Sequence, residues 1–102
     1  MASSLEFVEY VVSQLSDCGL ISYKRMFGEY GIYCDGIYFG AICNNNFLVK
    51  ITDKGKELKD FNTGYPYEGA KPMFLIEDLE DKEVLAKLVE ITCNELTKKS
   101  KK

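Results

Sequence analysis

Hydrophobic residues recur at helical spacing near both ends of the chain and alternate with polar residues in between. Near the start, one apolar stripe is formed by Leu5, Val8, Val11, Val12 and Leu15. This spacing predicts a helix over residues 3–18. Ser3 and Glu6 stand three apart, as in a capping box, and Gly19 suits the left-handed residue that follows a helix.

A second long stripe predicts a helix over residues 81–98. Its buried positions are expected to be Leu85, Leu88, Val89, Thr92 and Leu96. Asp81 is the expected N-cap, and the lysines near the end suit the negative end of the helix dipole. A short helix over residues 54–61, capped by Thr52 or Asp53, is predicted in the middle of the chain.

The block between the first two helices is predicted to be an antiparallel β-meander. Its strands are expected over residues 23–27, 32–34, 37–43 and 47–51, joined by turns at residues 28–31, 35–36 and 44–46. Asp35-Gly36 is the strongest hairpin signal, because a type I′ turn needs positive φ at both central positions. Residues 62–71 are predicted to be a loop and residues 72–76 a strand. The order α-β-β-β-β-α-β-α is typical of an α+β domain and not of a doubly wound parallel sheet.

The hairpin turn also predicts which residues share a face of the sheet. A two-residue turn at Asp35-Gly36 places Ile32 opposite Phe39 and Gly31 opposite Gly40. With a three-residue loop at 44–46, the face toward the helices collects Ile32, Cys34, Ile37, Phe39, Ala41, Cys43, Phe47, Val49 and Ile51. The opposite face is mixed and is the expected contact surface; it collects Tyr33, Tyr38, Gly40, Ile42, Leu48, Lys50 and Thr52.

Composition is that of a single domain spanning residues 1–102, with 46% hydrophobic and 28% charged residues. The formal net charge is −3, so the chain lacks the overall positive field of a typical nucleic-acid-binding domain. Positive charge gathers in a tail over residues 98–102, at Lys98, Lys99, Lys101 and Lys102. This tail is expected to be frayed and solvated. A phosphate-contacting arm is the alternative interpretation.

Few residues suggest catalysis or metal binding. The chain has no histidine, which excludes Ser/His/Asp and Cys/His arrangements, and its four cysteines form no C-x-x-C pair. We expect no metal site, no cofactor and no enzymatic activity. Cys34 and Cys43 are expected to be buried, inert thiols. The protein is expected to be cytoplasmic, because no apolar run approaches the roughly 20 residues that span a bilayer.

One motif runs from Arg25 to Tyr33 and continues through Asp35-Gly36 to Phe39. Its characteristic residues are Arg25, Met26, Phe27, Gly28, Tyr30, Gly31, Tyr33, Gly36 and Phe39. On these residues the chain resembles the TfoX N-terminal domain family over about residues 5–97, although it has Glu29 where the family often has a second glycine. The resemblance implies an α+β fold similar to that of secretion chaperones. It also implies a bacterial protein related to competence regulators, which act through protein contacts beside a DNA-bound activator and carry a second domain. Here we expect the N-terminal domain to stand alone.

The residues that we expect to form an interaction surface are Arg25, Met26, Tyr30, Tyr33, Tyr38 and Lys50. Arg25 falls on the apolar face, so it is expected either to reach over the sheet edge toward a carboxylate or to anchor an acidic or phosphorylated partner. The predicted function is a regulatory domain that binds a protein, such as a transcription regulator, or a second copy of itself. The alternatives are nucleic-acid binding through the lysine tail and the Tyr33/Tyr38 face, and an unrecognised enzyme or small-molecule binder.

Overall fold

The computed structural model describes residues 4–16, 18–26 and 29–100, excepting the side chains of Met26 and of residues 98–100. Its elements are α1 (Leu5–Gln14), β1 (Ile21–Met26), β2 (Glu29–Cys34), β3 (Ile37–Cys43), β4 (Asn46–Val49), α2 (Asp53–Leu58), β5 (Asn62–Gly64), β6 (Met73–Ile76) and α3 (Lys82–Ser100). The predicted α+β class and the order of the predicted elements are therefore confirmed, with one added strand, β5.

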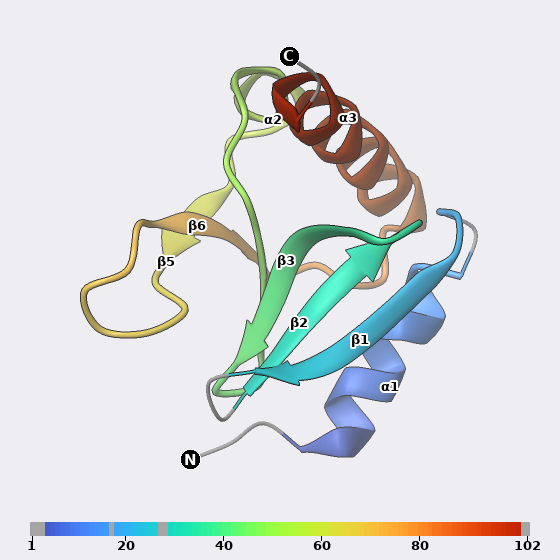
Figure 1. Cartoon of the computed structure of the whole chain (residues 1–102), viewed down its shortest axis with the longest axis vertical. Coiled ribbons are helices and arrows are strands. Elements are labelled where there is room, and N and C mark those ends of the chain that lie inside the picture. Colours follow the sequence, from blue (N-terminus) through green and yellow to red (C-terminus); the bar gives the residue numbers. More distant parts are fainter. Residues whose placement is uncertain (1–3, 17, 27–28, 101–102) are drawn as a thin grey trace.

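All neighbouring strands are antiparallel and form one six-stranded sheet in the order β1-β2-β3-β4-β6-β5. β1 and β5 are its edges. Figure 1 shows where the helices lie relative to the sheet: α1 packs beside β1, and α3 packs on β3 and on α2.

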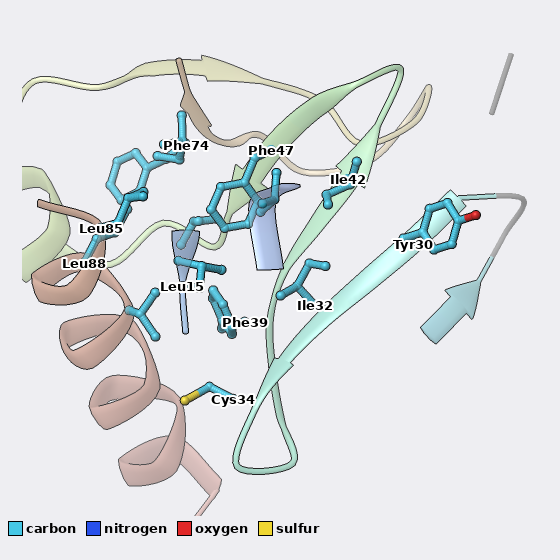
Figure 2. Packing of buried hydrophobic residues seen from close by; sticks show 14 of the residues in the cluster. Leu15, Tyr30, Ile32, Cys34, Phe39, Ile42, Phe47, Phe74, Leu85 and Leu88 are labelled. Atoms are coloured by element: carbon cyan, nitrogen blue, oxygen red, sulfur yellow. The ribbon is translucent and has the colours of Figure 1, made fainter. Parts of the chain in front are cut away.

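The main core lies between one face of the sheet and the helices. Its fully buried side chains include Val8, Val11, Leu15, Ile32, Phe39, Ile42, Phe47, Val49, Leu85, Leu88 and Val89. Figure 2 shows the aromatic rings of Phe39, Phe47 and Phe74 directed into this space, and the rings of Phe39 and Phe47 meet edge to face, 6.4 Å apart. The helical stripes predicted in α1 and α3 supply the other side of the core, so these predictions are confirmed except for Leu5, which is exposed at the start of α1.

The hairpin at Asp35-Gly36 forms as predicted. Both residues have positive φ, 51° and 84°, and Cys34 pairs with Ile37. The pairing of Ile32 with Phe39, however, is wrong. The register shifts between Ile32 and Tyr33, so that Tyr33 pairs with Tyr38 but Ile32 pairs with Gly40. Phe39 is the extra residue of a β-bulge, which reverses the alternation of all later side chains in β3.

This bulge corrects several predicted positions. Gly31 pairs with Ala41 and not with Gly40. Ile42 belongs to the main core, whereas Ala41 and Cys43 lie on the other face with Leu48 and Met73. That second cluster is buried too, so the outer face of the sheet is partly apolar.

The loop at residues 44–46 is also shorter than predicted. Asn44 and Asn45 form a two-residue turn with φ of 52° and 57°. Asn46, the first residue of β4, pairs with Cys43, the last residue of β3. The loop is one residue shorter than predicted, and the bulge leaves one residue of β3 unpaired. The two deviations cancel in the alternation of side chains along β4. Phe47 and Val49 consequently still reach the main core, as predicted.

Other boundaries differ at the ends of elements. The predicted turn at residues 28–31 is wrong, because Glu29, Tyr30 and Gly31 belong to β2 and Met26 pairs with Glu29. The predicted cap Ser3 lies outside the described residues. The N-cap of α1 is Ser4, whose side chain accepts a hydrogen bond from the Phe7 amide, so the capping-box prediction fails.

Helix ends deviate in both directions. α1 ends at Gln14 with Leu15 as its C-cap, so Gly19, with φ of 121°, shapes the following loop and does not terminate the helix. α2 ends at Leu58, three residues earlier than predicted. α3 begins at the predicted N-cap, where Asp81 accepts a hydrogen bond from the Val84 amide, and its backbone stays helical through Ser100. The predicted fraying from residue 98 onward is therefore wrong for the backbone of residues 98–100.

Residues 62–71 do not form only a loop. Asn62–Gly64 adds β5 to the edge of β6, with Thr63 opposite Phe74. The remaining segment folds against the outer face of the sheet, because Pro66 and Tyr67 line a cavity of about 100 Å³ together with Tyr38, Ala41 and Cys43. This segment thus lies beside Ala41 and Cys43 of the second apolar cluster.

Candidate functional site

Two tyrosines and two lysines form a continuous row across the outer face of the sheet. Tyr33 and Tyr38 are opposite each other at the end of the β2–β3 hairpin, with ring centroids 5.5 Å apart. The ammonium group of Lys24, on β1, lies 5.7 Å from the Tyr33 ring, and that of Lys50 lies 4.5 Å from the Tyr38 ring. Both distances fall within the roughly 6 Å of a cation–π contact. We call Lys24, Tyr33, Tyr38 and Lys50 the tyrosine–lysine row.

The two tyrosines face each other because they lie between the hairpin turn and the bulge, where simple alternation holds. Tyr33 pairs directly with Tyr38, and Lys24 lies diagonally from Tyr33, because Ser22 is the direct partner of Tyr33. Lys50 continues the strand pairing through its amide, which donates to the Phe39 carbonyl at 2.9 Å. The sequence therefore identified three of the four residues, and strand alternation in β1 could have added Lys24.

Tyr38 and Lys50, at one end of the row, are both half-buried. Burial lowers the pKa of Lys50. Burial also raises the pKa of Tyr38, with smaller contributions from Cys43, Tyr33 and Tyr67. Each shift disfavours the charged form, as expected when a group loses water. The Tyr38 phenol is therefore harder to ionise than a phenol in water.

Arg25 lies on the face that the sequence predicted. It pairs with Tyr30 on the helix side of the sheet, at the exposed edge strand β1. Its guanidinium group is stacked over the Tyr30 ring, 5.5 Å from the centroid, and Tyr23 meets the same ring edge to face at 5.9 Å. The Arg25 cation thus packs on the Tyr30 ring on the apolar face of the sheet. From the sequence, the expected contact was a carboxylate or an acidic or phosphorylated partner.

Not every predicted surface residue is at the surface. Tyr30 is only 6% exposed and belongs to the main core, because it lies within β2, paired with Arg25 on one side and Ile42 on the other. The Met26 side chain, Phe27 and Gly28 lie outside the described residues. Arg25 faces the opposite side of the sheet from Tyr33, Tyr38 and Lys50, so the predicted residues do not form one surface.

The remaining motif residues serve the fold. Gly36 occupies the left-handed region that the hairpin turn requires, and Phe39 is fully buried at the bulge. Gly31 is buried in β2 between Lys24 and Ala41. These three motif residues thus shape the β2–β3 hairpin and its packing.

Three of the four thiols approach one another at one end of the sheet. The Cys34 thiol, on β2, donates to the Cys18 carbonyl at 3.4 Å, and Cys93 of α3 lies beside it. Burial, with a smaller contribution from the neighbouring Cys34, raises the pKa of Cys93 to about 12. Burial likewise raises the pKa of Cys34, and it raises that of Cys43 to about 11 on the outer face. Such thiols are poor nucleophiles.

Beyond Lys50, the row leads into a groove on the outer face. Its volume is about 880 Å³, and its boundary includes Tyr38, Lys50, Lys56, Tyr67, Lys71 and Met73. We call it the basic groove. Lys56, Tyr67 and Lys71 were not predicted as site residues, and no local pattern identifies them, because α2 and the segment before β6 meet only in the folded chain.

Two further structural tests concern metals and membranes. In the described part of the chain, no group of three or more Cys, Asp or Glu side chains is arranged to hold a metal ion. Likewise, none of the described helices combines the length and apolar character needed to cross a membrane.

Comparison with known proteins agrees with the resemblance seen in the sequence. The model of the TfoX N-terminal domain matches residues 13–95. A relative from Spirochaeta aurantia, named as an uncharacterized 12.7 kDa protein in the trpE 5′ region, is 36% identical over 80 residues. That match covers 78% of this chain and 70% of the relative. The chain belongs to the TfoX N-terminal domain family.

Proposed function

We propose that this chain is a non-catalytic, cytoplasmic regulatory domain that acts by binding another protein through the outer face of its sheet. The tyrosine–lysine row is the observation that carries the proposal. It presents half-buried aromatic rings with a cation at either end, and aromatic residues are enriched where proteins bind one another. The family supports a role as a transcription co-regulator, with a transcription regulator or a second copy of the chain as the partner.

The chemistry of the described residues supports binding over catalysis. Burial raises the pKa values of the Cys43 and Cys93 thiols and of the Tyr38 phenol. The chain also has no histidine to serve as a general base.

Nucleic-acid binding is the second candidate, because tyrosine rings flanked by lysines also resemble a stacking platform for single strands. The net charge of −3 argues against it. It predicts affinity for single-stranded DNA that falls as salt rises and falls when residues 98–102 are removed.

The proposed function can be tested by capture of proteins from nuclease-treated lysate of the source organism. Bait proteins are the wild type, the double variant Tyr33→Ser/Tyr38→Ser, and Tyr10→Ser as a matched control. Tyr10 is an exposed tyrosine on α1, on the helix side of the sheet. We expect the same protein to be captured by the wild type and by Tyr10→Ser but lost with the double variant. Equal capture by all three baits, or none by any, contradicts the proposal.

A further inference from the structure

The basic groove concentrates positive charge on a chain that is acidic overall. Lys50, Lys56 and Lys71 all line it, and none of the described residues that line it is Asp or Glu. The protein as a whole has 16 acidic and 13 basic residues. By contrast, the hollow of about 590 Å³ beside Cys93 is lined by Asp35, Glu83 and Glu90 as well as one lysine. The charge of the basic groove is thus a local property that favours an anionic ligand.

Lys50 is the inner cation of the groove. Its side chain is half-buried, and its ammonium group lies 4.5 Å from the centre of the Tyr38 ring. Burial lowers its pKa, so the contact with the Tyr38 ring does not fully offset the loss of water around the ammonium group. An anion in the groove would supply the missing opposite charge.

The groove also has apolar and aromatic parts. Met73, from the second apolar cluster, and Tyr38 form part of its lining, and Tyr67 stands at its margin with 59% of its surface exposed. A ligand that is only a point charge would leave these surfaces unused. The groove suits a ligand in which negative charges alternate with an aliphatic or aromatic group.

The arrangement of the cations favours an extended ligand. Lys50 follows β4, Lys56 is in α2 and Lys71 precedes β6, so the three charges come from separate segments along an open groove. A compact phosphate site normally gathers backbone amides or a helix N-terminus around one anion. Here the N-terminus of α2 carries the acidic residue Asp53, which opposes that use.

We infer that the basic groove binds an acidic peptide segment of the partner protein, in which carboxylates face Lys50, Lys56 and Lys71 and an apolar side chain packs on Tyr38 and Met73. This inference rests on the proposed function and specifies the partner's chemistry. The tyrosine–lysine row then extends the same binding surface across the sheet.

The test uses fluorescence anisotropy of the full chain with four probes. The first is a short labelled peptide in which Glu and Asp alternate with Leu and Phe. The second has Gln and Asn in place of the acidic residues, the third is a single-stranded DNA of similar length, and inorganic pyrophosphate serves as an unlabelled competitor. We expect the acidic peptide to bind most tightly and its affinity to fall as salt rises.

Variants locate the binding. The triple variant Lys50→Gln/Lys56→Gln/Lys71→Gln should weaken the acidic peptide about tenfold or more, because several charge contacts are lost together. Tyr67→Ser should weaken it without changing the salt dependence. Lys87→Gln is the matched control, because Lys87 is an exposed lysine that lines the other hollow. Unchanged thermal unfolding of each variant shows that the fold is intact.

The outcomes separate this inference from the proposed function. Equal affinity for the acidic and neutral peptides, no peptide binding, or an unaffected triple variant overturns the groove inference. Protein capture that still depends on Tyr33 and Tyr38 would then leave the proposed function standing. Tighter binding of the DNA, or full displacement of the peptide by pyrophosphate at comparable concentration, overturns the inference in favour of a phosphate ligand. DNA binding without any protein capture rejects both.

Discussion

Gly40 in β3 lies so close to Leu48 in β4 that a Cβ atom on Gly40 would stand 2.5 Å from the Leu48 carbonyl oxygen. That oxygen belongs to a strand held on both sides, by β3 and by β6, so it cannot move aside at low cost. We expect Gly40→Ala to lower the free energy of unfolding by about 1–3 kcal/mol. Urea unfolding followed by circular dichroism measures this change.

The matched control is Gly64→Ala in β5. A Cβ atom there meets only the Leu48 Cδ2 atom at 3.4 Å and the Leu75 Cβ atom at 3.9 Å, and φ is not positive. Because alanine also restricts the unfolded chain, this variant should be neutral or more stable by up to about 1 kcal/mol. Equal effects of the two substitutions would mean that the close approach of β3 and β4 at Gly40 is incorrect.

The bulge next to Gly40 explains why the sequence predicted the strands better than their faces. A turn such as Asp35-Gly36 is marked by residues that accept positive φ, whereas Phe39 and Gly40 carry no sign that one residue is left unpaired. Phe47 and Val49 were placed correctly because two one-residue errors, in β3 and in the Asn44-Asn45 turn, cancelled.

The candidate site shows the same limit. Tyr33 and Tyr38 could be paired from the sequence because they lie next to a recognisable turn, before the bulge. Lys56 and Lys71 could not be joined to them, since their meeting depends on how α2 and the segment before β6 pack. Tyr30 was misplaced because Gly28 and Gly31 together resemble a turn, although Gly31 lies within β2.

Thr92 offers a second test of the core. Its hydroxyl oxygen on α3 is fully buried and has no hydrogen-bond partner in the described structure. A buried hydroxyl without a partner costs about 1–3 kcal/mol, whereas valine has nearly the same shape and no polar group. Thr92→Val should therefore raise the free energy of unfolding, by about 1–2 kcal/mol.

Thr52→Val is the contrasting substitution. Thr52 is the N-cap of α2, and its hydroxyl oxygen accepts a hydrogen bond from the Gly55 amide at 3.0 Å. The loss of this cap should destabilise the protein by about 1 kcal/mol. Thermal unfolding of both variants gives shifts of opposite sign, and a destabilised Thr92→Val would show that its hydroxyl has a partner.

Asp35 combines a backbone requirement with a side-chain hydrogen bond. Its φ is 51°, and its carboxylate accepts a hydrogen bond from the Leu20 amide at 3.1 Å. Alanine tolerates the left-handed region poorly and removes the acceptor, so Asp35→Ala should cost about 1–2 kcal/mol of stability. Asparagine tolerates this region and keeps an acceptor oxygen, so Asp35→Asn should change stability by less than about 0.5 kcal/mol. Urea titration of the two variants compares these effects directly.

The buried thiols predict a loss of stability at alkaline pH. An unfolded cysteine ionises near pH 9, whereas burial raises the pKa of Cys93 to about 12 and that of Cys43 to about 11. A folded pKa above the unfolded value means that the stabilisation is complete below about pH 9 and is lost as pH rises toward 11 to 12. Tyr38 acts in the same direction, and Lys50, whose pKa is lowered by burial, acts in the opposite one.

A paired comparison isolates the thiols from the other groups that titrate in this range. The free energy of unfolding is measured at about pH 8 and about pH 10.5 for the wild type and for Cys43→Ala/Cys93→Ala. The double variant is expected to be less stable at the lower pH because it loses buried volume, but its stability should fall less between the two values. Val89→Ala is the control, because Val89 is buried on α3 and has no titratable group, so its pH dependence should match the wild type. If the wild type and the double variant lose the same stability between the two pH values, the thiols are not the cause, and the two cysteines are less shielded from water than their positions on β3 and α3 indicate.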